Sequence, residues 1–205
     1  MYIEALIQLL QARVKTTGLE KTPKDGRFLL VCNHQFIADP GILHYFFRKS
    51  QLAFISKKEN DDLPFISAFL HKTLCQSIDR EDDRQALQVI LKCIRILKED
   101  KASVCVFPEG STNHDELLHP FRPGVFKIAQ KANVPIVVCT VRNTQTVFGN
   151  MKKLKPSCVE LHLVDVIPAE ELKGQTTVDI ANRVHKLMAD DLGPDLVLQE
   201  NTDTP

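Results

Sequence analysis

A short, largely apolar stretch of the chain, VCNHQFIADPGIL at residues 31 to 43, carries a histidine and an aspartate five positions apart. Inside one helix, residues at this spacing would lie about 140° apart around the axis, and their side chains would not meet. Across a turn from a strand into a helix they can meet, and the Asp39-Pro40 pair is typical of a helix start. A carboxylate on one ring nitrogen of His34 would leave the other nitrogen free to take a proton. The pair therefore indicates activation of a hydroxyl group, with a simple helix cap as the alternative for Asp39.

Two further stretches carry residues that could act on a substrate. VFPEGSTN, residues 106 to 113, follows a predicted strand and sets Glu109 between Pro108 and Gly110, in a turn expected to display the carboxylate. In an α/β sheet this loop should open at the same edge as His34. In SIDRED, residues 77 to 82, Arg80 follows another predicted strand, and its guanidinium could hold a phosphate through two hydrogen bonds. A surface turn and a solvated helix start are the alternatives for these two stretches.

The composition is that of an ordinary globular protein. The chain has 205 residues, 43% of them hydrophobic and 25% charged, which suits a single domain over residues 1 to 205 with a substantial core. Its six cysteines form no C-x-x-C pair and mostly stand among aliphatic residues, which predicts a reduced, cytoplasmic compartment. No stretch has the roughly 18 to 20 apolar residues that a membrane span needs, and no cleavable signal is evident. A transmembrane or secreted protein is not expected.

The net charge of zero conceals a pattern along the chain. Lys and Arg outnumber Asp and Glu by 9 to 4 over residues 1 to 58 and by 7 to 1 over residues 121 to 160. Acidic residues outnumber basic ones by 12 to 7 over residues 59 to 120 and by 9 to 3 over residues 161 to 205. The basic blocks could meet a phosphate-bearing substrate or an anionic lipid surface. Alternation between solvated faces is the simpler interpretation of charge alone.

The first 14 residues predict an amphipathic helix, because their apolar residues recur at helical spacing. Ile3, Leu6, Ile7, Leu10 and Val14 share one stripe. Such a helix can pack on its own domain or lie in a membrane interface, and the basic residues that follow it permit the second arrangement.

The rest of the chain alternates between strand and helix patterns. Strands are predicted at residues 27–33, 52–57, 75–79, 102–107, 135–142 and 158–167, and helices at 40–49, 62–73, 83–99, 124–132 and 177–192. A polar tail is expected over residues 194–205. The alternation predicts an α/β fold in a single domain, with a largely parallel or mixed sheet flanked by helices and an N-terminal amphipathic helix.

Taken in order along the chain, these stretches resemble the glycerolipid acyltransferases, best known from the 1-acyl-sn-glycerol-3-phosphate (lysophosphatidic acid) acyltransferases. The four sequence blocks of that family are matched by NHQFIAD (33–39), SIDR (77–80), FPEGST (107–112) and VPIVVC (134–139). The segment FRPGVFKIAQKANVPIV (121–137) is also similar to the link between the family's last two blocks. The likeness runs from about residue 18 to residue 167.

The resemblance implies a role for each of these residues. His34 would be the general base that takes the proton of a glycerol hydroxyl as it attacks an acyl thioester, and Asp39 would orient the imidazole. Arg80 would hold the acceptor's phosphate, while Glu109, Gly110 and Ser111 would shape the acceptor site. The resemblance implies no metal or organic cofactor, with acyl-CoA or acyl-carrier protein as cosubstrate. The partners it implies are a lysophospholipid acceptor and a membrane surface, with peripheral attachment at the cytoplasmic side and no nucleic acid.

Two positions depart from the family pattern. Phe36 stands where many members have serine two positions after the histidine, and Thr112 stands where an arginine usually follows FPEG and a small hydroxyl residue. The second change removes a cation from the expected phosphate site. Arg122 or another basic residue between 121 and 155 would then replace it, or the acceptor would be a different lysophospholipid.

Other classes of function fit parts of the pattern. A thioesterase would use water as acceptor at His34 and Asp39, and a lipid- or nucleotide-binding module would use the basic blocks without chemistry. A metal site is the weakest alternative, since the histidines are dispersed and only His114 and His119, near Asp115 and Glu116, could share an ion.

Overall fold

The computed structural model describes residues 12–59, 70, 73–78, 83–113, 115–152 and 155–198. Its strands are β1 (Ala12–Thr17), β2 (Leu29–Cys32), β3 (Leu52–Lys57), β4 (Gln76–Ile78), β5 (Ser103–Val106), β6 (Ile136–Arg142) and β7 (Ser157–Ile167). Its α-helices within the described residues are α2 (Asp39–Phe46), α4 (Asp83–Lys98), α5 (Lys127–Ala132), α6 (Thr146–Lys152) and α7 (Thr177–Leu192). Short 3₁₀ turns, among them η4 (Pro123–Phe126) and η6 (Pro194–Leu196), join them.

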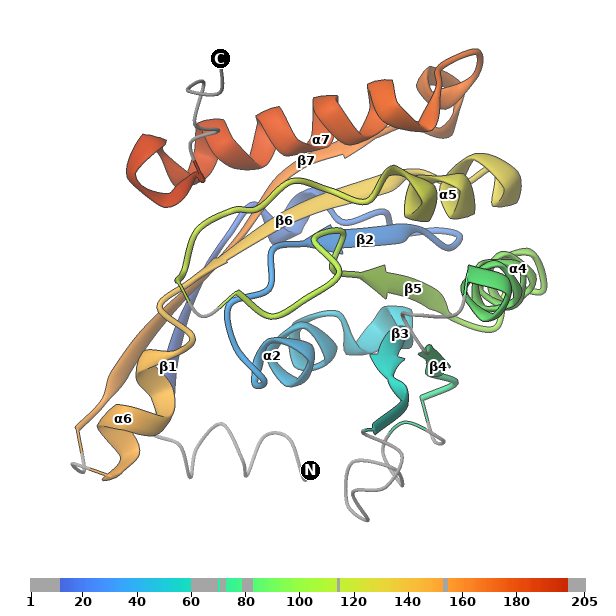
Figure 1. The fold of residues 1–205 in the computed structure, drawn as a ribbon. Helices are drawn as coiled ribbons and strands as arrows, with labels where there is room; N and C mark the ends of the chain where they lie inside the picture. The colour runs from blue at the N-terminus through green and yellow to red at the C-terminus, as the bar shows by residue number, and fades with distance from the viewer. Residues whose placement is uncertain are drawn as a thin grey trace.

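All seven strands belong to one mixed sheet, in the order β1-β7-β6-β2-β5-β3-β4 (Figure 1). Every neighbouring pair is parallel except β6 and β7, which run antiparallel with a register shift between Val138 and Cys139. The helices return the chain between parallel strands, as right-handed crossovers require. The predicted α/β fold with a largely parallel or mixed sheet is therefore confirmed.

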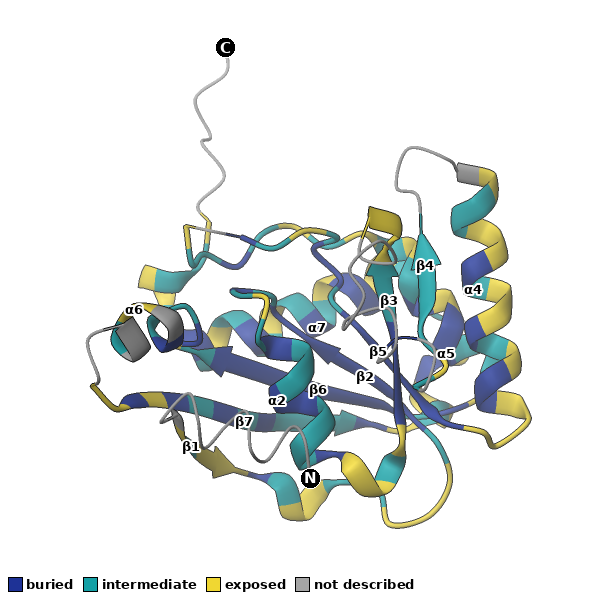
Figure 2. Cartoon of the chain, turned by 90° about the horizontal axis from the view of Figure 1, so that it is seen from below, coloured by how far each residue is buried: buried dark blue, intermediate teal, exposed yellow. Residues whose placement is uncertain are grey.

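Apolar side chains fill the space on both faces of the sheet. In β2, Leu29 and Val31 point to the face covered by α4, α5 and α7, while Leu30 and Cys32 point to the face covered by α2. Figures 1 and 2 show these two layers of helices on opposite sides of the sheet. A central strand buried on both faces reads as a continuous apolar run, which is why LLVC has no alternation.

The loops that follow β2 and β5 lie side by side at one edge of the sheet. The two strands are parallel neighbours, with Val31 paired to Val106, so both chains leave the sheet at its carboxyl edge. A backbone hydrogen bond of 2.9 Å from Asn113 N to His34 O joins the two loops beyond the strands. The prediction that His34 and the Pro-Glu-Gly turn share one edge is confirmed.

Most predicted elements are present with small shifts in their ends, but two boundaries were wrong and one helix was missed. The helix predicted over residues 1 to 14 gives way to a strand from Ala12, while residues 1–11 lie outside the described residues. The helix predicted to Lys49 ends at Phe46 and is followed by a 3₁₀ turn over Arg48–Ser50. The helix α6 was not predicted, since seven residues are too few to show a helical period.

Two further predicted segments, residues 62–73 and 194–205, are described only in part. Of the helix predicted over 62–73, only residues 70 and 73 are described, and Thr73 lies in a turn. The tail predicted from residue 194 begins as the 3₁₀ turn η6. Leu118 N donates to Leu196 O and Leu118 O accepts from Leu198 N, so the first residues of the tail belong to the fold. Among the helices that are described, none is long and apolar enough to span a bilayer.

Candidate active site

His34 and Asp39 meet across the turn between β2 and α2. The distance from His34 Nδ1 to Asp39 Oδ2 is 2.8 Å, and the aspartate side chain is fully buried while 14% of the histidine side chain is exposed. The backbone N–H groups of Gln35 and Phe36 donate to the same oxygen, each at 2.8 Å. The predicted contact is confirmed, and the alternative in which Asp39 only caps α2 is wrong, because Ala38 holds the cap position and the carboxylate turns back into the loop.

The surroundings of His34 fix its tautomer and the plane of its ring. Asp39 Oδ2 already accepts two backbone N–H groups, and an ionised carboxylate can only accept, so His34 Nδ1 carries the proton. The lone pair is then on Nε2, at the far side of the ring. The ring stacks on Phe107 at a centroid distance of 4.0 Å and an interplanar angle of 19°. The imidazole is thus held in the orientation of a general base.

Glu109 is buried, which corrects the prediction that its carboxylate would be displayed. Only 7% of the residue is exposed, and its two oxygens accept from groups of both loops. Oε1 accepts from His34 N at 2.8 Å, while Oε2 accepts from His119 N at 3.0 Å and from Asn113 Nδ2. Burial raises its pKa from 4.5 to about 7, against the lowering effect of the backbone hydrogen bonds from His119 and His34. The carboxylate therefore fixes the backbone of His34 instead of facing solvent.

The Pro-Glu-Gly turn brings Arg122 beside Gly110. Gly110 has φ of 79°, and a Cβ on it would stand 2.7 Å from Arg122 Nε. Arg122 N also donates to Pro108 O at 2.8 Å, which ties the two segments together. Ser111 is exposed and donates to Asn113 Oδ1 at 3.2 Å. The predicted residues Glu109, Gly110, Ser111 and Arg122 are thus gathered near His34, whereas Arg80 lies outside the described residues.

Two buried asparagines that sequence reasoning missed hold the site together. Asn33 is 2% exposed and pairs with Val141 of β6 through both ends of its amide, donating to the carbonyl at 3.0 Å and accepting from the N–H at 2.8 Å. Asn113, 6% exposed, links Glu109 to the backbone of His34. Both lie within stretches already quoted, NHQFIAD and VFPEGSTN, but neither was given a role, and a polar residue at the end of a buried strand was the available signal for Asn33.

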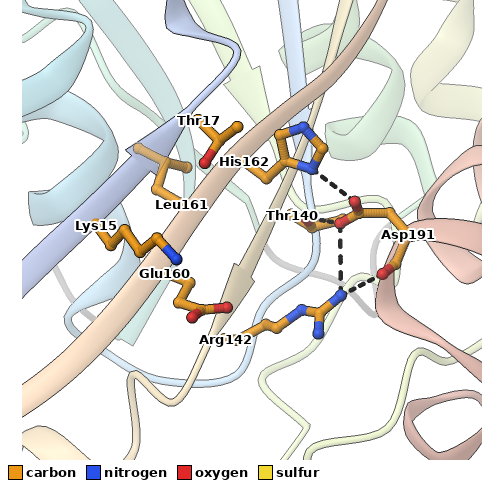
Figure 3. A pocket seen from close by; sticks show the side chains of 8 residues that line it. All are labelled: Lys15, Thr17, Thr140, Arg142, Glu160, Leu161, His162 and Asp191. Carbon is orange, nitrogen blue, oxygen red and sulfur yellow. Dashed lines mark hydrogen bonds and ion pairs between the residues drawn. The ribbon is translucent and has the colours of Figure 1, made fainter.

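A second histidine-aspartate pair lies in a cavity of about 170 Å³ between β1, β7, β6 and α7 (Figure 3). His162 Nδ1 contacts Asp191 Oδ1 at 2.5 Å, and Thr140 Oγ1 donates to Asp191 Oδ2 at 2.5 Å. Arg142 also donates to the Asp191 carbonyl. Asp191 lies in the last turns of α7, on the face of the sheet opposite α2, so this network anchors the end of that helix and is separate from His34.

The metal alternative receives no support from the described residues. His119 Nε2 contacts Asp115 Oδ2 at 2.8 Å, which pairs two residues four apart in the sequence with each other. His114 lies outside the described residues, and in the part of the chain that is described no three histidine, cysteine or acidic residues group as metal ligands.

The site has a recognisable form, in which the ring of His34, oriented by the buried carboxylate of Asp39, lies at the carboxyl edge of an α/β sheet. Such an arrangement suits a general base that acts on a hydroxyl group. The family model for "Acyltransferase" matches residues 13–142, and the chain belongs to this family.

The relatives are also similar over most of this chain. A 1-acyl-sn-glycerol-3-phosphate acyltransferase from Saccharomyces cerevisiae is 27% identical over 187 residues, which cover 90% of this chain and 61% of the relative. One from Chlamydomonas reinhardtii is 30% identical over 188 residues, 90% of this chain and 54% of the relative. The chain thus spans little more than half the length of these relatives.

The fold matches a solved structure. The crystal structure of the 1-acyl-sn-glycerophosphate (LPA) acyltransferase PlsC from Thermotoga maritima aligns with a TM-score of 0.77 and 20% identity. The alignment covers 98% of this chain and 79% of that one. At this identity the likeness establishes the fold alone.

Proposed function

We propose that this chain transfers a fatty acyl group from acyl-CoA or acyl-carrier protein to the free hydroxyl of 1-acyl-sn-glycerol 3-phosphate, which gives phosphatidic acid in phospholipid biosynthesis. The observation that carries the proposal is the 2.8 Å contact between His34 Nδ1 and the buried Asp39 carboxylate, within the spacing H-x-x-x-x-D. The names of the relatives in Saccharomyces cerevisiae and Chlamydomonas reinhardtii supply the acceptor.

The proposed reaction uses His34 as the base and no covalent enzyme intermediate. The acceptor oxygen attacks the thioester carbonyl carbon while its proton passes to His34 Nε2, and Asp39 stabilises the imidazolium that forms. Collapse of the tetrahedral intermediate breaks the carbon-sulfur bond, and the proton on Nε2 is available to the leaving thiolate. General base assistance of this kind contributes roughly 10²- to 10⁴-fold in rate.

Two cations, Arg122 and Arg80, are proposed to hold the acceptor's phosphate. Arg122 lies against Gly110, and Arg80 is assigned the same role from its place in the SIDR block. Thr112 stands where the family usually has arginine, which favours a contribution from Arg122. The same substitution motivates the alternative acceptor, another lysophospholipid.

The first prediction tests the base. His34→Ala should lower the turnover of acyl-CoA with lysophosphatidate by roughly a hundredfold or more, because the proton loses its acceptor. His162→Ala is the matched control and should keep its turnover. His162 also contacts a carboxylate through Nδ1, but it lies in the Asp191 network at the end of α7. The measurement is thiol release by purified protein with a panel of lysophospholipids. Equal turnover of wild type and His34→Ala would refute the proposed mechanism.

The same assay separates acyl transfer from hydrolysis. If the chain is an acyltransferase, thiol release depends on added acceptor, and acylated lipid accumulates in equal amount. Thiol release that is independent of acceptor would establish the thioesterase instead. Arg80→Ala should chiefly raise the KM for the acceptor, because a phosphate contact binds ground state and transition state alike.

We also propose peripheral attachment at the cytoplasmic side of a membrane, with the amphipathic segment at residues 1–11 as one contact. Deleting residues 1–11 leaves β1 intact from Ala12, so the shortened chain should still fold. We expect it to float less with anionic vesicles than the full chain. Equal recovery of the two chains would remove this segment from the proposal.

A further inference from the structure

The segment that follows α7 pairs with the loop between the Pro-Glu-Gly turn and η4. Leu118 N donates to Leu196 O at 2.7 Å, and Leu198 N donates to Leu118 O at 3.1 Å. These two bonds form a parallel bridge between Leu118 and Val197. Leu118 is 1% exposed, and Leu196 and Val197 pack against the core on the α7 side of the sheet. The 194–198 segment is thus held against this loop by backbone bonds and by apolar packing.

One peptide group connects this bridge to the carboxylate of Glu109. The carbonyl of Leu118 and the N–H of His119 belong to the same peptide group, and in a planar trans peptide they point to opposite sides. On one side the carbonyl accepts from Leu198 N, and on the other side the N–H donates to Glu109 Oε2 at 3.0 Å. Because hydrogen bonds in a chain polarise one another, the first bond also strengthens the second. Leu198 therefore lies one peptide plane away from Glu109.

Glu109 carries the connection on to His34. Its other oxygen, Oε1, accepts from His34 N at 2.8 Å, and only 7% of the residue is exposed. Asn113 Nδ2, from the same loop as His119, also donates to Oε2. A buried carboxylate that loses a donor costs free energy, so Glu109 is expected to follow the His119 N–H when the loop moves. The backbone of His34 would then move with it.

The side chain of Leu198 has little part in this arrangement. It belongs to a residue that is 37% exposed, and the contact with Leu118 is made by the backbone N–H. Val197, which precedes it, is extended, with φ of −119° and ψ of 128°, a conformation that is allowed before proline. The N–H and the side chain of Leu198 can therefore be removed separately.

We propose that Leu198 is a positioning residue of the active site. Its backbone N–H holds the Leu118–His119 peptide in the orientation that donates to Glu109, and Glu109 in turn holds the backbone of His34. The expected effect on turnover rests on the proposed function, whereas the chain of contacts does not depend on the acceptor. A bridge that only stabilised the fold would have no effect on kcat in a folded variant.

The first test compares Leu198→Pro, which deletes the N–H, with Leu198→Ala, which keeps the N–H and shortens the side chain. In the full chain, Leu198→Pro should lower kcat for acyl transfer to lysophosphatidate by about tenfold or more, because a small displacement of the base is costly in rate. The change in KM should be smaller, since no acceptor contact is removed. Leu198→Ala should retain the kcat of the wild type. Urea denaturation identifies the variants that are folded under the assay conditions.

The second test needs neither a substitution nor a substrate. Hydrogen exchange of single amides, followed by NMR at several urea concentrations below the unfolding transition, shows which N–H groups become exposed in one opening event. We expect the amides of Leu198, His119 and His34 to share one event, with equal free energy of opening and equal dependence on urea. The amide of Leu30, buried in β2, should open only at a higher free energy.

Three outcomes would overturn the proposal: an unchanged kcat of folded Leu198→Pro, an equal loss of kcat in Leu198→Ala, or amides of His119 and His34 that stay protected while that of Leu198 exchanges. If Leu198→Pro does not fold, the exchange experiment on the wild type decides alone. Absence of acyl transfer by the wild type would instead refute the proposed function, and the exchange result would still show whether Leu198 positions His34.

Discussion

At the scale of single residues, the sequence predicted contacts that depend on local chain geometry and missed those that depend on packing. His34 and Asp39 were predicted to meet because five residues spanning a strand, a turn and Asp-Pro leave few arrangements. Glu109 was wrongly expected to be displayed, since the donors that bury it come from both of the adjoining loops. A turn motif shows that a carboxylate follows the strand, but it does not show which N–H groups will donate hydrogen bonds to it.

Glu109 also leads to a prediction about pH. Its pKa is raised from 4.5 to about 7 by burial, so the folded protein holds this proton more tightly than the unfolded chain. Its contribution to stability is therefore full below about pH 4.5 and is lost as pH rises to about 7. The difference in free energy of unfolding between Glu109→Gln and wild type should therefore change by about 3 kcal/mol across that interval.

Urea denaturation at a series of pH values measures this difference. Glu170→Gln is the control, since it makes the same substitution at an exposed glutamate. The prediction is contradicted if the free energies of unfolding of Glu109→Gln and wild type, plotted against pH, stay parallel from about pH 5 to about pH 8. The Glu109 carboxyl group would then not titrate in this range.

At the scale of elements, patterns of period two and period 3.6 located most strands and helices, and tertiary partners decided the rest. Residues 12 to 14 continue a helical stripe, yet Val14 lies in a strand because β7 offers a parallel edge from Ser157 onward. The helix α6 is too short to show a helical period, and it packs against β7. Such partners lie far away in sequence, where no local pattern can show them.

Gly18, which follows β1, allows a sharp test of how that strand is held. A Cβ on Gly18 would stand 2.3 Å from the Leu163 carbonyl oxygen, a contact with backbone that cannot be relieved by a side-chain movement. Gly26 has nearly the same φ, 75° against 76°, but nothing lies within 4 Å of its Cβ position. Gly26→Ala should therefore cost about 1 to 2 kcal/mol from backbone strain alone, and Gly18→Ala about 2 kcal/mol more.

Chemical denaturation gives the free energy of unfolding of Gly18→Ala and of Gly26→Ala, and the difference between them is the cost of the clash with Leu163. Similar midpoints for Gly18→Ala and Gly26→Ala would show that β1 can move away from β7 at little cost.

At the scale of the whole molecule, the class of fold was predictable and the antiparallel pairing of β6 with β7 was not. Alternating strands and helices favour parallel neighbours, and among the described strands five of the six pairs are parallel. The strands β6 and β7 are joined through the short α6, and the direction of β7 was not visible in its apolar pattern. The two-sided core explains why the cysteines stand among aliphatic residues.

The cysteines give a prediction that reports on the packing of the entire fold. Cys158 is exposed, whereas Cys32, Cys93, Cys105 and Cys139 are buried and Cys75 is half-buried, and burial raises the pKa of all five of these thiols. Only thiolates react readily with alkylating reagents. Mass spectrometry after brief treatment of the native chain should find a single label at Cys158, and six labels after unfolding. Several labels on the native chain would contradict the packing described for the sheet.

The pairing of β1 with β7 has a consequence for how the protein is made. Ala12 lies beside Ser157, so the first described strand is synthesised long before the strand that completes its ladder. Until β7 has been synthesised, the residues of β1 lack this sheet partner, and their backbone groups are open to pairing with a strand of another chain. The charged side chains of Arg13 and Lys15 on β1 suit this interval, because they oppose edge-to-edge association until β7 emerges.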